Sequence, residues 1–97
     1  AEKVAVLGGP QVITVTAAVR AERGVRSEKG ALIYQIGDDA QSATGLKPGD
    51  VIFMVNRQRI ATAEELRQIF NGAQGRAALR VYFERGGQTG YSDFYVQ

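Results

Sequence analysis

The segment that most constrains the fold of this 97-residue chain is residues 45–56, which read GLKPGDVIFMVN. Gly45 suits the end of a short helix over the small residues 40–44, because glycine adopts the left-handed conformation without a Cβ penalty. Pro48 and Gly49 favour a tight turn, and the side chain of Asp50 can accept hydrogen bonds from the turn's free amides. Residues 51–55 are all apolar, which predicts a strand with no solvated face. Such a helix, turn and buried strand need a compact barrel around them.

Further elements follow from the remaining pattern. We expect strands at residues 11–16, 31–36, 59–60, 77–84 and 89–96, a short helix at residues 17–23 stopped by Gly24, a turn at residues 37–39 and a hairpin turn at residues 85–88. Residues 4–7 form a short apolar run that ends at Gly8, Gly9 and Pro10.

The clearest helix is predicted for residues 62–70. Thr62 and Glu65 have the spacing of a capping box, in which the hydroxyl and the carboxylate each accept from a free backbone amide. We expect Asn71 and Gly72 to end this helix. Leu66 and Ile69 lie on one stripe, and Ala63, Arg67 and Phe70 lie on another.

Composition indicates one small globular domain, residues 1–97. The apolar share is 44%, the charged share is 23% and the net charge is only +2, so nothing demands nucleic acid or membrane as a partner. No apolar run approaches 18 residues, and the first residues lack a signal-peptide pattern, so we expect no insertion into a membrane.

The chain lacks the residue types on which most catalytic sites depend. The absence of histidine and cysteine removes the Ser-His-Asp and Cys-His nucleophile systems and makes a zinc site improbable. No phosphate-binding glycine pattern occurs either. We therefore expect no catalytic residue, no metal and no cofactor.

The segment GLKPGDVIFMVN is similar to the core signature of PDZ domains. GALIYQI (residues 30–36) and ATAEELRQIF (residues 61–70) occur around it in the order found in the PDZ domains of bacterial HtrA/DegP-like serine proteases, as do AAVRAERGV before them and ALRVYFERGGQTGYSDFYV after them. The resemblance covers about residues 8–96. It implies an α+β fold in which about six mostly antiparallel strands form a partly open barrel or sandwich capped by two or three helices. In this circularly permuted type, the last strand takes the place of the first strand of animal PDZ domains.

The resemblance also implies a peptide-binding site that works by β-strand addition. It assigns the carboxylate loop to Leu7, Gly8, Gly9 and Pro10, the groove strand to Gln11, Val12, Ile13, Thr14 and Val15, and the groove helix to Ala63, Arg67 and Phe70. In this interpretation Phe70 closes the pocket for the last peptide side chain together with Leu7 and Ile13, while Leu66 and Ile69 face the core. Phe70 in the core is the open alternative.

The predicted loop departs from the family pattern. Leu7-Gly8-Gly9 lacks the aliphatic residue at the third position, and Pro10 removes one amide donor. Capture of a carboxylate would then rest on the amides of Gly8 and Gly9, and a plain turn at residues 8–10 is the open alternative. Ala63 leaves room for a side chain two residues upstream in the peptide, and Arg67 favours an acidic or polar residue there.

Three functions stay open. The first is a module that binds peptide C-termini or unfolded segments for a serine protease domain, with a possible second PDZ domain, in a periplasmic or other bacterial extracytoplasmic compartment. The second is an assembly module with a closed groove, or a PDZ module of another envelope protease or secretion protein. The third, which we disfavour, is a basic barrel that binds nucleic acid or anionic lipid through Arg57, Arg59, Arg76 and Arg80.

Overall fold

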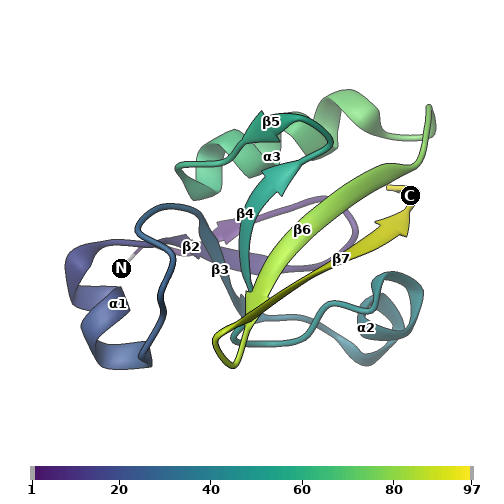
Figure 1. The fold of residues 1–97 in the computed structure, drawn as a ribbon. Helices are drawn as coiled ribbons and strands as arrows, with labels where there is room; N and C mark the ends of the chain where they lie inside the picture. Colours follow the sequence, from purple (N-terminus) through teal and green to yellow (C-terminus); the bar gives the residue numbers. More distant parts are fainter. Residues whose placement is uncertain (1, 97) are drawn as a thin grey trace.

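A computed structural model of the chain describes residues 2–96. Figure 1 shows an antiparallel sheet with helices placed around it. The strands are β1 (Val4–Ala5), β2 (Gln11–Thr14), β3 (Ala31–Gln35), β4 (Val51–Val55), β5 (Gln58–Arg59), β6 (Leu79–Arg85) and β7 (Gln88–Phe94), and the helices are α1 (Ala17–Arg23), α2 (Asp38–Thr44) and α3 (Ala63–Ala73).

The sheet has the order β1-β2-β3-β4-β6-β7, with β5 paired to β4, and every pairing is antiparallel. Helix α3 contacts β1, β2 and β3, whereas α2 contacts β7. Figure 1 shows α3, α1 and α2 at three separate places around the sheet. The predicted α+β architecture, with mostly antiparallel strands and two or three helices, is therefore confirmed, and the helices number three among residues 2–96.

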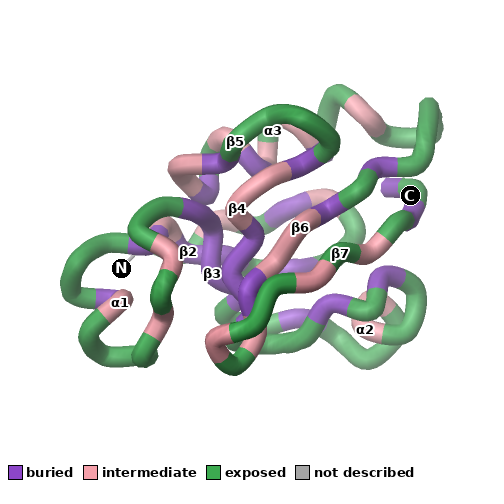
Figure 2. Tube along the Cα trace, in the orientation of Figure 1, coloured by how far each residue is buried: buried purple, intermediate pink, exposed green. Residues whose placement is uncertain are grey.

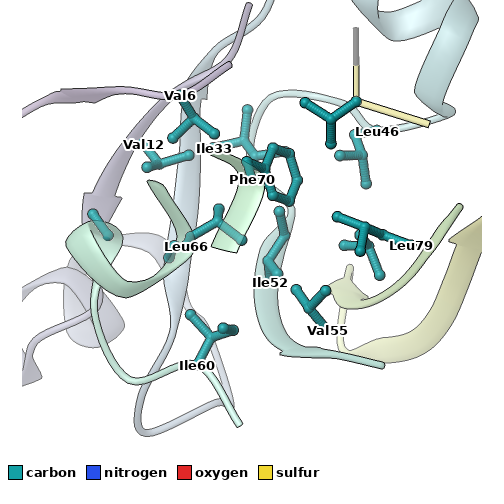
Figure 3. Packing of buried hydrophobic residues seen from close by; sticks show 14 of the residues in the cluster. Val6, Val12, Ile33, Leu46, Ile52, Val55, Ile60, Leu66, Phe70 and Leu79 are labelled. Carbon is teal, nitrogen blue, oxygen red and sulfur yellow. The ribbon is translucent and has the colours of Figure 1, made fainter. Parts of the chain in front are cut away.

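Two apolar clusters hold these layers together. The larger lies between the sheet and α3 and includes Val12, Ile33, Ile52, Leu66 and Phe70 (Figure 3). The smaller packs α1 against the opposite face of the sheet and consists of Ile13, Val15, Val19, Leu32 and Val51. Alternate residues of β2 and β3 enter different clusters, as the period of two in a strand requires. Figure 2 shows the buried positions gathered along the central strands.

The GLKPGD turn adopts the predicted conformation. Gly45 closes α2 with a φ of 74°, Gly49 has a φ of 93°, and the Lys47 amide donates to Asp50 Oδ2 at 2.9 Å. The two glycines adopt backbone angles that would strain other residues. The Asp50 side chain accepts from the Lys47 amide, which has no partner in the sheet.

Several predicted boundaries were wrong. The strand expected at residues 11–16 ends at Thr14, where the chain turns toward α1, and the brief strand expected at residues 59–60 lies at Gln58–Arg59. Asp38 and Asp39 do not form a turn but make the first turn of α2, where carboxylates suit the positive end of the helix. Helix α3 also continues through Asn71 and Gly72 to Ala73. The left-handed glycine that follows its end is Gly75, with a φ of 68°.

The loop between α1 and β3 is held by one buried carboxylate. Glu84 of β6 is 6% exposed and accepts from Ser27 Oγ at 2.6 Å, the Ser27 amide at 2.7 Å and the Arg26 amide at 2.8 Å. Burial alone raises the pKa of Glu84, but these three hydrogen bonds outweigh it and hold the pKa below its ordinary value. The ionised carboxylate is thus part of the fold.

Candidate functional site

The candidate groove lies between the edge of β2 and helix α3. A capping box starts α3, because Thr62 Oγ1 accepts from the Glu65 amide at 3.1 Å and Glu65 Oε1 accepts from the Thr62 amide at 3.0 Å. The amide of Ala63 donates to Thr14 Oγ1 at 2.9 Å. This bond ties the first turn of α3 to the end of β2, so the two walls are fixed relative to each other.

Strand β1 occupies part of the groove edge. It pairs antiparallel with β2, with Val4 opposite Val12 and Ala5 opposite Gln11. Helix α3 contacts both β1 and β2. A segment of this chain therefore lies where an added strand would pair with β2.

The residues after β1 turn tightly into β2. The amide of Val6 donates to the carbonyl of Pro10 at 2.8 Å, and the amide of Gly9 donates to the carbonyl of Val6 at 3.1 Å. Gly8 and Gly9 have φ angles of 92° and 112°, in the left-handed region that favours glycine. The predicted carboxylate loop is thus a closed hairpin turn in which the Gly9 amide already has an acceptor.

Val6 of the segment after β1 and Val12 of β2 both turn their side chains into the core beside α3. Figure 3 shows both side chains on the side of α3 that carries Phe70 and Leu66. Val6 is 5% exposed and Val12 is fully buried. Ile13 and Val15 point to the opposite face and pack with Val19 of α1. The structure therefore does not bring Ile13 to Phe70, because adjacent strand residues face opposite ways.

Helix α3 does not turn one of the two predicted stripes to the groove and the other to the core. Ala63 and Phe70 are buried in the same cluster as Leu66, and Ile69 is only partly buried against it. The Phe70 ring makes an edge contact with Phe94 at 5.9 Å between ring centroids. Phe70 therefore has the packing of a core residue.

Arg67 lies at the rim of the groove. Its Nε donates to the two carboxylate oxygens of Glu64 at 2.9 and 3.0 Å. The hydrogen bond from Arg67 lowers the pKa of Glu64. Arg67 and Asn71 border a hollow of about 350 Å³, whose other lining residues are Ala5, Val6, Leu7, Gly8 and Gly9.

A separate apolar cavity of about 200 Å³ lies on the other side of the turn. Leu7, Gly8, Pro10 and Phe70 line it, together with residues of α2 and of the C-terminal segment: Asp39, Ala40, Ala43, Thr44, Phe94, Tyr95 and Val96. The structure thus brings the predicted pair Leu7 and Phe70 to one cavity.

Residues Val4 and Val6 were not among the predicted site residues. The sequence does carry a weak signal for them, because a short apolar run, residues 4–7, ends at Gly8 and Gly9. That pattern is typical of a hairpin, but a two-residue strand is too short to be assigned from periodicity.

In the part of the chain that the structure describes, no three acidic, histidine or cysteine side chains gather where a metal ion could bind. Across residues 2–96, no helix has the length and apolar character needed to cross a bilayer.

No protein-family model matches the chain. It is 39% identical over 77 residues to a probable periplasmic serine endoprotease DegP-like from Brucella suis biovar 1 (strain 1330), and this match covers 76% of the chain and 15% of the relative. It is 35% identical over 74 residues to the protein of the same name from Chlamydia trachomatis serovar D, covering 73% of the chain and 15% of the relative. The chain thus spans about 15% of the length of the curated relatives it matches.

Among solved structures, the chain is similar to the HtrA3 PDZ domain bound to a phage-derived ligand, FGRWV. The TM-score is 0.76 at 18% identity, over 97% of this chain and 84% of that one.

Proposed function

The chain is a PDZ domain related to HtrA/DegP-like proteases, and on this premise we propose that it is a non-catalytic module that binds extended peptide segments in the groove between β2 and α3. The ligand adds as an antiparallel strand to β2, so that backbone hydrogen bonds supply affinity and side-chain pockets supply selectivity. The proposed site consists of the turn Leu7–Pro10, the strand residues 11–15 and the helix residues Ala63, Arg67 and Phe70.

The position of β1 carries this proposal. An extended segment already lies antiparallel to β2 and in contact with α3, which is the arrangement that strand addition requires. The similarity to the HtrA3 PDZ domain, which is bound to a peptide ligand, supports peptide binding.

We propose further that the module belongs to a serine endoprotease and presents substrates to it or regulates it. The relatives are named as probable periplasmic serine endoproteases, which supports an extracytoplasmic compartment. The protein partners would then be unfolded segments or peptide C-termini, the protease domain and a possible second PDZ domain.

An NMR titration with the pentapeptide FGRWV, as free acid and as C-terminal amide, tests the proposal. We expect chemical shift changes at Gly8, Gly9, Val12, Thr14 and Phe70, and stronger binding by the free acid. Shift changes confined to other parts of the chain, or none up to millimolar peptide, would refute the groove as a peptide site.

A structural role in assembly is the second candidate. Strand β1 covers part of the β2 edge, the Gly9 amide is engaged and Pro10 has no amide hydrogen. These features favour a groove that stays closed. Retention of β1 amide protection in the presence of peptide would support this role over recognition.

The basic-surface alternative has less support. Arg80 Nε donates to Asp93 Oδ1 at 2.9 Å, and its guanidinium lies 4.3 Å from the centre of the Tyr91 ring. One of the four arginines in that hypothesis is therefore already neutralised by a carboxylate.

A further inference from the structure

We propose that residues Val4–Val6 are a built-in ligand that competes in cis for the groove, and that an external peptide binds only when they leave. This inference rests on the proposed peptide-binding function and adds the regulation of that site. Residues Val4–Val6 are called the cis strand below.

The cis strand reproduces the direction of an added peptide. It runs antiparallel to β2, and its last residue, Val6, directly precedes the turn. The Gly9 amide donates to the Val6 carbonyl at 3.1 Å. In this geometry the Val6 carbonyl takes the place of the terminal oxygen of a ligand.

The side chains of the cis strand are also placed like those of an added peptide. Val6 is buried in the cluster that contains Phe70, and Val4 is partly buried against the same cluster, whereas Ala5 is exposed. The alternation places two β-branched apolar side chains on the groove floor. The groove therefore favours ligands with an aliphatic last residue, as FGRWV has.

The attachment of the cis strand is weak enough for exchange. Strand β1 has only two residues, and Val6 is the one residue of the cis strand that is buried. Gly8 and Gly9 follow after Leu7 and supply a hinge with few steric limits. Short segments with few buried apolar contacts open locally without global unfolding.

A covalent lock tests this competition. Ala5 and Gln11 are exposed and lie opposite each other on β1 and β2, and the chain has no cysteine. The double variant Ala5→Cys/Gln11→Cys should form a disulfide that holds the cis strand in place. The matched control Tyr82→Cys/Tyr91→Cys locks the β6–β7 pair, away from the groove.

Titration of both variants with FGRWV, oxidised and then reduced, gives the result. We expect the apparent affinity of the Ala5/Gln11 variant to fall at least tenfold on oxidation, because binding scales with the population of the open state. The control variant should bind equally in both redox states. Equal binding by the locked and reduced Ala5/Gln11 variant would overturn the inference while leaving peptide binding intact.

A release variant gives the opposite change. Val4 borders a hollow together with Glu2 and Glu64, so Val4→Asp adds a third carboxylate there and removes apolar contact. We expect Val4→Asp to bind FGRWV, and the pentapeptide EKVAV taken from residues 2–6, about tenfold more tightly than the unaltered chain. Ala5→Asp, which alters the exposed neighbour, should change affinity less than twofold. If no variant binds either peptide, the proposed function fails, and the inference with it.

Discussion

Arg85 of β6 holds the buried carboxylate of Asp50 through two hydrogen bonds, from Nε to Oδ1 at 2.7 Å and from Nη2 to Oδ2 at 2.6 Å. The same Nη2 donates to the carbonyl of Gly45 at 2.9 Å. Arg85 thus fastens both ends of the GLKPGD segment to the β6–β7 hairpin. Paired donors in a planar fork make this contact geometrically specific.

Arg85→Met should destabilise the domain by about 3 kcal/mol, because it leaves the carboxylate of Asp50, which is fully buried, without its cation. This loss is at the low end of what breaking a buried ion pair costs, because the Arg85 side chain is 40% exposed and water can reach part of the site. Urea denaturation at pH 7 measures the change. Arg80→Met is the matched control, because the Arg80–Asp93 pair is exposed on both sides, and it should leave the midpoint nearly unchanged. Equal losses in the two variants would contradict the structural role of Arg85.

Stability should depend on pH through Glu84. Its pKa in the folded state lies below the ordinary value of 4.5, so the stabilisation is fully present above about pH 5 and is lost as pH falls through the folded pKa. Glu84→Gln, which cannot accept all three bonds, should lower stability at pH 7 and flatten the acid side of the profile. Denaturation midpoints at pH 7, 5 and 3.5 test this. An unchanged pH profile in the variant would rule out Glu84 as the source.

Gly30→Ala should be strongly destabilising, by about 2–3 kcal/mol. Gly30 has a φ of 141°, and a Cβ atom there would lie 2.6 Å from the carbonyl oxygen of Ile52 on the neighbouring strand. The backbone of a paired strand cannot move aside as a side chain can. Gly72→Ala is the control, because Gly72 lies within α3 with open space around it. That substitution should stabilise the domain by up to about 1 kcal/mol. Thermal denaturation of both variants shows whether their effects have opposite signs.

Phe70→Ala should lower the free energy of unfolding by about 3–5 kcal/mol, because the ring is 2% exposed and its removal leaves a cavity. Phe70→Leu should cost less than about half of that, since much of the volume is retained. Urea denaturation measures both changes. A loss of less than about 1 kcal/mol in the free energy of unfolding of Phe70→Ala is typical of a surface position. That result would contradict a core role and would indicate that the ring lines an open groove.

Local elements were well predicted where one residue type carries the signal. The helix at residues 17–23, the capping box of Thr62 and Glu65, and the hairpin that pairs Arg85 with Gln88 were all confirmed. The predicted end of α3 was wrong because a glycine only weakens a helix and does not have to end it. The helix continues through Gly72 to Ala73.

The groove was predicted in outline and not in detail. Val12 and Thr14 do face α3, but Ile13 does not, and Phe70 packs into the core rather than standing apart from it. The site residues therefore stay predictions until peptide binding is measured.

By itself, the sequence determined the GLKPGD turn, the turn between Arg85 and Gln88, the caps at Thr62 and Gly24 and the order of the elements, because these depend on the backbone freedom of glycine and proline and on side chains a few residues away. Only the tertiary structure decided that β1 covers the edge of β2, that Glu84 holds Ser27 and that Arg85 reaches Asp50. Such contacts join residues far apart in the chain or too few to form a pattern, so their partners are set by how the whole sheet closes around its core.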